Sequence, residues 1–187
     1  MDSKLQIISG RFHGRKLYLP PNARPTQNRA RAALFNMLAS GLVNVGDNLC
    51  VWDAFAGSGA FGIEFLSRYP NSRVIFTDID PESVRTVQKN LSLLNIGTAA
   101  SVVQSDAIIA ADKYAQSADV IFVDPPYDSA VKGAEFVNRV ASRIKDGAIL
   151  IWEQELSQSV MPPVEWRILR DKTYGRARFF VLTRGDE

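Results

Sequence analysis

The chain contains very little of the chemistry that disulfides and metal sites need. Its 187 residues include one cysteine, Cys50, and one histidine, His13. A single cysteine cannot form an internal disulfide, and one His with one Cys does not supply the ligands of a zinc site. We therefore expect a protein of the reducing cytoplasm that holds no metal.

Long apolar runs, internal repeats and low-complexity segments are also missing. No run approaches the ~20 apolar residues of a membrane-spanning helix, and the N-terminus shows no apolar core of a secretory signal. Hydrophobic residues make up 46% of the chain and charged residues 22%, which is typical of a globular domain and not of a disordered or fibrous chain. The composition predicts a globular protein without a membrane partner.

Acidic residues are scarce in the first sixth of the chain. Residues 1–31 carry seven basic side chains and one acidic side chain, although the net charge of the whole chain is only +2. A basic arm on a mildly acidic body favours docking of a polyanion at one end of the molecule. The alternative is that these arginines and lysines form an ordinary solvated surface.

After residue 41 the pattern alternates between short apolar runs and helical segments. Strands are predicted at 49–53, 73–78, 101–104, 119–123 and 148–152, and helices at 60–69, 82–94, 107–116 and 131–144. Because the strands are apolar on both faces, they indicate a parallel sheet that is covered by helices. The tail has no helical period and predicts an antiparallel hairpin that turns near Tyr174–Gly175.

The sequence thus predicts an α/β fold with a seven-stranded, mostly parallel sheet and an antiparallel C-terminal hairpin. We place this domain at residues 41–187. Residues 1–40 are expected to form a small extension that faces the polyanion. It comprises a β-hairpin around Gly10–Gly14, a proline-marked loop and a helix over 27–40, with Arg29 and Arg31 off its apolar stripe.

Four acidic residues lie at the carboxyl ends of the first four predicted strands of the sheet: Asp53, Asp78, Asp106 and Asp124. The carboxyl ends of parallel strands are where open α/β sheets bind ligands. Asp53 begins the turn "DAFAGSG", in which Gly57 and Gly59 allow a sharp bend and a close approach of a ligand. The turn is neither the dinucleotide fingerprint nor a phosphate-binding Walker loop. An acid at this place suits a ligand with a cationic amine.

The other acids have more than one interpretation. Asp78 can accept hydrogen bonds from both ribose hydroxyls of a nucleoside. Asp80 precedes Pro81 and is expected to cap the next helix. Asp106 can contact an adenine amine or cap the helix after it, and both readings stay open. A ligand with an amine, ribose hydroxyls and an exocyclic amine, such as S-adenosylmethionine, would use three of the four strand-end acids.

The fourth strand ends in "DPPY", residues 124–127. Two consecutive prolines cannot donate hydrogen bonds to a sheet, so the strand stops there and presents Asp124 and Tyr127 from a stiff turn. A plain strand exit is the alternative interpretation of this motif.

These motifs resemble those of class I S-adenosylmethionine-dependent methyltransferases, which have a Rossmann-like fold. More narrowly, the chain resembles the bacterial family that methylates the exocyclic N2 amine of a guanine in small-subunit 16S ribosomal RNA. The resemblance is carried by "IISGRFHGRKLYLP", "RPTQNRARAALFNML", "DAFAGSGAFGIEFLSR" and "VDPPY". The chain departs from the usual family pattern at Asn28 (usually Asp), Ala32 (usually Glu) and Asp78 (commonly Glu).

The resemblance implies the roles of particular residues. Asp124 and the Pro125 carbonyl would accept the hydrogens of the target amine, Pro126 would stiffen the turn, and Tyr127 would stack on the flipped base. The implied cofactor-binding residues are Asp53, Phe55, Ala56, Gly57, Gly59, Asp78, Ile79, Asp106, Ala107 and Asp124. The implied RNA-binding residues are Arg11, Arg15, Lys16, Arg24, Thr26, Arg29 and Arg31. We expect a monomer that acts on 16S rRNA, alone or within an assembling small subunit.

Two other functions are compatible with parts of the pattern. DNA adenine-N6 methyltransferases share the DPPY motif, but they usually carry a target-recognition domain for which 187 residues leave no room. A non-catalytic RNA-binding or assembly factor could use the same scaffold, although the glycine turn and the strand-end acids are intact. Binding of S-adenosylmethionine separates this factor from an enzyme.

Overall fold

The computed structural model describes residues 5–21, 28–41, 45–126 and 130–185. Seven strands form one sheet in the order β3-β2-β1-β4-β5-β7-β6. The five strands β1 (Cys50–Asp53), β2 (Arg73–Asp78), β3 (Ala100–Gln104), β4 (Val120–Val123) and β5 (Ile149–Glu155) run parallel. The final pair, β6 (Trp166–Tyr174) and β7 (Ala177–Arg184), is antiparallel, and β7 also pairs antiparallel with β5. The predicted sheet, including its C-terminal hairpin, is confirmed.

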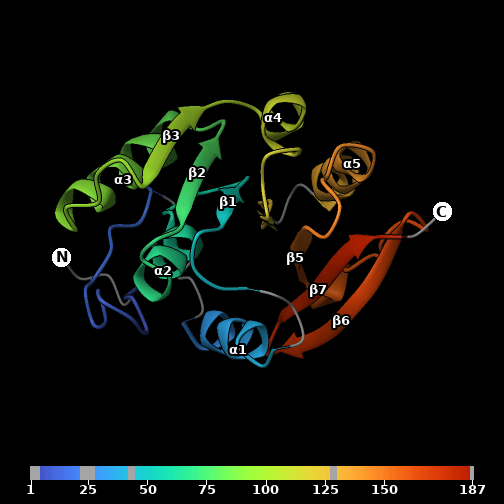
Figure 1. The fold of residues 1–187 in the computed structure, drawn as a ribbon, viewed down its shortest axis with the longest axis horizontal. Coiled ribbons are helices and arrows are strands. Elements are labelled where there is room, and N and C mark those ends of the chain that lie inside the picture. Colours follow the sequence, from blue (N-terminus) through green and yellow to red (C-terminus); the bar gives the residue numbers. More distant parts are fainter. Residues whose placement is uncertain (1–4, 22–27, 42–44, 127–129, 186–187) are drawn as a thin grey trace.

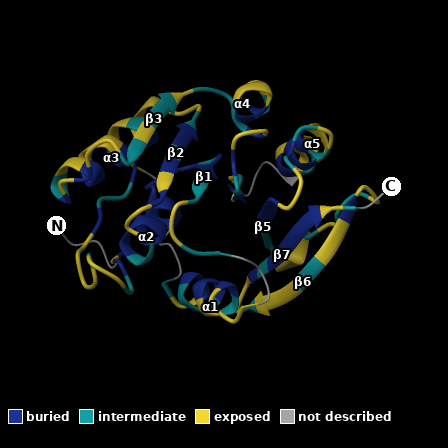
Figure 2. Cartoon of the chain, viewed as in Figure 1, coloured by how far each residue is buried: buried dark blue, intermediate teal, exposed yellow. Residues whose placement is uncertain are grey.

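Helices cover both faces of the sheet, as shown in Figure 1. One face packs against α1 (Asn28–Leu38), α2 (Ala60–Arg68) and α3 (Pro81–Leu93), and the other against α4 (Ala107–Tyr114) and α5 (Ala130–Ala141). Alternate residues of each strand enter the two hydrophobic clusters. In β4, for example, Phe122 belongs to the cluster of α1–α3 and Val123 to the cluster of α4 and α5. Figure 2 shows the buried strands between the helical layers.

Local sequence explains where two of the helices begin. The Asp80 carboxylate accepts hydrogen bonds from the backbone N–H groups of Glu82 and Ser83, and Pro81 occupies the first turn of α3, so the predicted cap is confirmed. Asp106 caps α4 by accepting from the N–H of Ile108 at 2.8 Å. This bond uses Oδ1, so a ligand contact by the same side chain stays a prediction.

The N-terminal segment forms the expected hairpin, but with a short ladder. Its two arms are joined by a single antiparallel bridge, Gln6↔Lys16, with a tight turn over residues 11–14. Several of its backbone N–H groups are used elsewhere: those of Ile8 and Ser9 donate to the side chain of Glu64 on α2. Side chains of the body therefore replace part of the ladder that a free hairpin would form.

The extension and the sheet share one hydrophobic core. Leu5, Ile7 and Leu17 of the N-terminal segment are at most 2% exposed and pack in the same cluster as α1, α2 and the sheet. The division into an extension over 1–40 and a domain over 41–187 stays a proposal about function. No helix in the described part of the chain is long and apolar enough to cross a membrane.

Candidate functional site

The sheet order changes direction between β1 and β4, because β2 and β3 lie on one side of β1 and β5 lies beyond β4. In open α/β sheets, ligands bind outside the carboxyl ends of the strands at such a point. A small crevice that opens to solvent lies at the ends of β4 and β5. It is lined by Asp124, Pro125, Pro126, Trp152, Glu153, Gln154, Glu155 and Gln158.

The glycine turn after β1 has the backbone geometry that its sequence predicts. Gly57 and Gly59 both have positive φ, 53° and 76°, a conformation that side chains other than glycine rarely adopt. The Asp78 carboxylate at the end of β2 accepts from the Gly57 N–H at 2.8 Å and from the Asp80 N–H at 2.9 Å. Burial raises the pKa of Asp78, and these two hydrogen bonds oppose that rise. Each oxygen keeps lone pairs that can accept from a ligand.

Asp53 is the most enclosed of the strand-end acids, with 1% of its surface exposed. Its Oδ2 accepts from the Gly62 N–H at 3.1 Å, in the first turn of α2. Burial raises its pKa well above the usual value, the Gly62 bond lowers it, and the charges of Asp124 and Asp78 raise it further. The structure thus brings Asp53, Asp78 and Asp124 close enough to interact. A direct contact of Asp53 with a ligand amine stays a prediction.

Other residues of the predicted cofactor set surround the same turn. Ala56 is buried and donates its N–H to the Thr77 carbonyl at 2.9 Å, and Phe55 is half-buried against Phe136 of α5. Ala107 is buried at the start of α4. Ile79, directly after Asp78, is 57% exposed, so it offers an apolar surface beside the turn.

Asp124 and Pro125 line the crevice where β4 ends. Solvent still reaches the Asp124 side chain, but the protein around it excludes much of the water that would stabilise its charge. This desolvation raises the pKa of Asp124 to about 7. A carboxylate with this pKa changes its charge near neutral pH. Tyr127 lies outside the described residues, so its stacking role stays a prediction.

Glu153, in β5, also lines the crevice. In the parallel pairing of β4 and β5, Val123 is opposite Trp152, so Asp124 and Glu153 follow at the same level. Because side chains alternate along a strand, both point to the face of the sheet that packs α1 and α2. Burial raises the pKa of Glu153 well above its usual value, the negative charge of Asp124 adds to this rise, and Arg31 opposes it.

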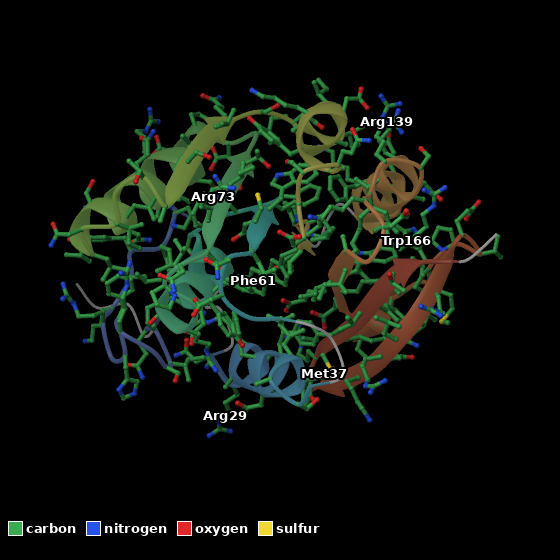
Figure 3. The ribbon with its side chains drawn as sticks, viewed as in Figure 1. Arg29, Met37, Phe61, Arg73, Arg139 and Trp166 are labelled. Carbon is green, nitrogen blue, oxygen red and sulfur yellow. The ribbon has the colours of Figure 1, made fainter. Side chains whose placement is uncertain are left out.

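The predicted RNA-binding residues divide into exposed and buried ones. Arg11, Arg15, Lys16 and Arg29 are exposed, and Figure 3 shows Arg29 pointing away from α1. The Arg11 guanidinium lies 4.4 Å from the centre of the Phe12 ring, and Arg15 donates to the Leu93 carbonyl. Arg24 and Thr26 lie outside the described residues.

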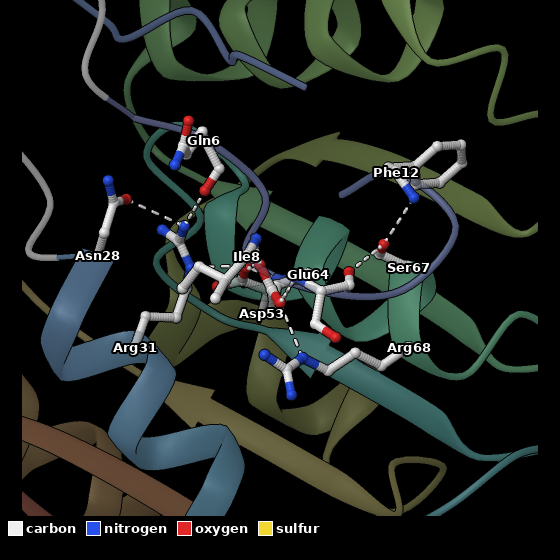
Figure 4. Close-up of polar contacts among 11 residues, drawn as sticks. Gln6, Ile8, Phe12, Asn28, Arg31, Asp53, Glu64, Ser67 and Arg68 are labelled. Carbon is white, nitrogen blue, oxygen red and sulfur yellow. Dashed lines mark hydrogen bonds and ion pairs between the residues drawn. The ribbon is translucent and has the colours of Figure 1, made fainter. Parts of the chain in front are cut away.

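Arg31 requires a correction, because it is not an exposed side chain beside the apolar stripe of α1. It is 5% exposed and donates to the Gln6 carbonyl at 2.5 Å and to Asn28 at 3.2 Å. Its Nε lies 3.7 Å from the Glu64 carboxylate, as shown in Figure 4. Burial lowers its pKa, and the charge of Glu64 opposes this. A guanidinium enclosed in this way is not available to an RNA phosphate.

Sequence reasoning missed two buried polar residues that fix the N-terminal segment. Glu64 is fully buried and accepts from the N–H groups of Ile8 (2.8 Å) and Ser9 (3.1 Å) and from Arg68 (2.7 Å). Asn90 is also fully buried and bonds both backbone groups of Tyr18 and the carbonyl of Ser58 in the glycine turn. The position of Glu64 within the apolar run "GIEFL" is a weak sequence signal that this acid is buried. The sequence around Asn90 contains no comparable signal.

Comparisons with known proteins agree with this architecture. A family model described as "Conserved hypothetical protein 95" matches residues 5–183. The protein named "Ribosomal RNA small subunit methyltransferase D" in Escherichia coli (strain K12) is 34% identical over 186 residues, which are 97% of this chain and 90% of the relative. A solved Escherichia coli structure has a TM-score of 0.79 at 32% identity and covers 96% of this chain and 97% of that chain. A Salinibacter ruber RNA methyltransferase in complex with S-adenosyl-L-homocysteine has the same fold, with a TM-score of 0.67 at 14% identity, and covers 88% of this chain and 95% of that chain.

Proposed function

The chain belongs to the family described as conserved hypothetical protein 95, and from this premise we propose that it transfers a methyl group from S-adenosylmethionine to the N2 amine of a guanine in small-subunit ribosomal RNA. The name of the Escherichia coli relative supports the substrate class. The observation that carries the proposal for this chain is the crevice in which Asp124 and Pro125 lie together at the end of β4.

The residues around the glycine turn fit the cofactor. Asp78 is anchored by two backbone N–H groups and keeps acceptor capacity for ribose hydroxyls. Ile79 offers apolar surface for an adenine ring, and Gly57 leaves room beside the backbone. When bound, S-adenosylmethionine supplies a methyl group on a positively charged sulfur, which is already a good leaving group. The protein therefore needs to position the amine rather than to form a covalent intermediate.

Asp124 and the Pro125 carbonyl perform this positioning in the proposed mechanism. The amine of guanine is a weak nucleophile because its lone pair is delocalised into the ring. Acceptance of both amine hydrogens by Asp124 and Pro125 favours a pyramidal nitrogen whose lone pair points at the methyl carbon. With the cofactor bound, the amine nitrogen would take the methyl group as the carbon–sulfur bond breaks, and the methylated nitrogen would then release one proton to solvent. Because the two prolines are rigid, the acceptor groups of Asp124 and Pro125 are already in position, and little conformational entropy is lost during the reaction.

A direct test uses the purified protein with unmodified small-subunit rRNA, as naked RNA and as assembled subunits. Labelled S-adenosylmethionine and mass mapping of the nucleosides should give a single N2-methylguanosine. Methylation of adenine would contradict the proposal, and so would binding of the cofactor without any transfer. The same experiment shows whether RNA or the subunit is the substrate.

Replacement of Gly133 by Ala should displace Pro125, and with it the turn that carries Asp124. A Cβ at Gly133 of α5 would lie 2.9 Å from Cγ of Pro125 and 3.1 Å from Nε1 of Trp152. Alanine favours helices by about 1 kcal/mol over glycine, but both of these rings are rigid and the turn must shift. We expect kcat to fall by roughly tenfold to a hundredfold, the scale of an ångström misplacement, with cofactor affinity unchanged.

Single-turnover rates and calorimetry with S-adenosylhomocysteine measure the two effects of Gly133→Ala. Gly97→Ala is the control, because a Cβ at Gly97 has no atom within 4 Å. Equal rates for the two variants would show that the position of Pro125 does not limit the reaction.

The exposed basic side chains of the N-terminal segment should carry RNA affinity. Changing Arg11, Arg15 and Lys16 together to Ala should weaken RNA binding and reduce the slope of log affinity against log salt by roughly 0.7 to 0.9 per lost phosphate contact. Cofactor affinity should not change. The control replaces three exposed lysines elsewhere, Lys113, Lys132 and Lys172, and removes the same charge. If the control lowers the slope equally, the RNA responds to net charge and not to this segment.

A further inference from the structure

The proposed mechanism uses Asp124 but leaves a second carboxylate in the same crevice without a role. Glu153 lines the crevice beside Asp124 and Pro125, and the strand register places it at the level of Asp124 on the same face of the sheet. Two negative charges on neighbouring strand ends repel each other. An ionised carboxylate in partly buried surroundings also costs free energy unless a cation or a hydrogen-bond donor pairs with it.

The surroundings of Glu153 do not satisfy its oxygens. Among the described residues, none donates a hydrogen bond to this carboxylate. The charged groups that act on it are Asp124 of β4, Arg31 of α1 and Glu155 of its own strand. Arg31 is the only cation among them, and it is itself held by Gln6 and by the carboxylate of Glu64. The carboxylate of Glu153 can therefore still accept hydrogen bonds from a ligand in the crevice.

Guanine and adenine differ in the atoms that they would present to this carboxylate. The edge of guanine that carries the N2 amine also carries the ring N1–H, so two adjacent positions donate hydrogen bonds. In adenine, N1 is an acceptor, and an ionised carboxylate repels it. Enzymes that flip a base read it through hydrogen bonds to this edge. A pair of neighbouring carboxylates matches the donor–donor edge of guanine and not the edge of adenine.

We propose that Glu153 accepts the N1–H of the target guanine while Asp124 holds the N2 amine, so that the two carboxylates select guanine over adenine. This inference rests on the proposed function. It makes Glu153 a specificity-determining residue. The N1–H and the N2 amine of guanine donate hydrogen bonds and so favour the ionised forms of Asp124 and Glu153. Binding of the base therefore releases any proton that these two acids share.

The test replaces the mapped guanine of the substrate RNA by 2-aminopurine, which keeps the 2-amine but lacks N1–H and the 6-oxygen. The parent should methylate guanine RNA at least about a hundredfold faster in kcat/KM, because a site built for a hydrogen bond strongly rejects an analogue that lacks it. Glu153→Gln should reduce this preference to less than about tenfold, since a rotated amide can donate to the N1 of 2-aminopurine. Glu165→Gln is the control, because Glu165 is exposed and does not line the crevice, and it should keep the preference of the parent.

A second readout excludes a merely structural effect. Because Asp124 and Glu153 repel each other, Glu153→Gln should lower the pKa of Asp124 and move the acid limb of the pH–rate profile to lower pH. An unchanged preference for guanine over 2-aminopurine, or an unmoved acid limb, in an active Glu153→Gln enzyme overturns the inference alone. A parent enzyme that methylates adenine instead of guanine overturns the proposed function and this inference together.

Discussion

Asp124→Ala should abolish most methyl transfer while the protein still binds its cofactor. The Asp124 carboxylate faces the crevice and the proposed amine, so its contribution is greatest in the transition state. Removal of one preorganised polar group at a reacting atom typically costs about a hundredfold or more in kcat, and we expect a loss of at least that size. Single-turnover methylation measures the rate, and calorimetry with S-adenosylhomocysteine measures the binding. A rate within a few-fold of the parent would remove Asp124 from the reaction.

Asp124→Asn is the informative comparison, because it keeps a carbonyl acceptor but cannot ionise. Desolvation by the surrounding protein raises the pKa of Asp124 to about 7. Below this pH the acid is protonated and accepts hydrogen bonds less well, so the rate of the parent should rise as pH increases through about 7. The apparent pKa belongs to the pair with Glu153. Asp124→Asn should be slower than the parent and should show a weaker dependence on pH in this range.

The sequence predicted the parts of the fold and site that depend on local pattern. Short apolar runs gave the strands, and the acids that follow them had to meet at one edge because parallel strands end on the same side of a sheet. Asp80 could be assigned to a cap because Pro81 follows it. The order of the strands in space, and hence the crevice between the ends of β4 and β5, comes from tertiary packing that these local signals do not contain.

The remaining errors concern contacts between distant residues. Arg31 looked like a surface arginine because its neighbours in α1 are small or polar, but its partner Glu64 lies 33 positions away. Glu153 continues β5 without a break in pattern, so nothing in the sequence tells whether it faces solvent or Asp124. The pairing of a buried acid with a buried base is visible only when both helices are placed.

The N-terminal segment is the clearest case of this limit. Its basic residues suggested an arm that sits on the outside of the domain. In the structure the outward face of the segment carries Arg11, Arg15 and Lys16, whereas its backbone is bonded to the buried side chains of Glu64 and Asn90. The charge variant described above therefore tests RNA binding more cleanly than a deletion, which would expose both buried groups.

Glu64→Ala should destabilise the fold more than any surface substitution. The change leaves the N–H groups of Ile8 and Ser9 without their acceptor and leaves Arg31 buried without its counter-ion. Breaking a buried charge pair by removing one partner costs about 3–5 kcal/mol. Urea denaturation should show this loss in the free energy of unfolding, and hydrogen exchange at Ile8 and Ser9 should become faster in the variant.

Glu82→Ala is the matched control for Glu64→Ala. Glu82 also lies on a helix and pairs with an arginine, Arg85, but both of these side chains are at least half exposed. Exposed pairs contribute about 0–1 kcal/mol, so this variant should unfold near the urea midpoint of the parent. If Glu64→Ala costs no more than Glu82→Ala, then the N-terminal segment is not fixed by Glu64. If its stability falls but exchange at Ile8 and Ser9 does not change, then the loss arises in α2 and the segment stays docked through its apolar residues.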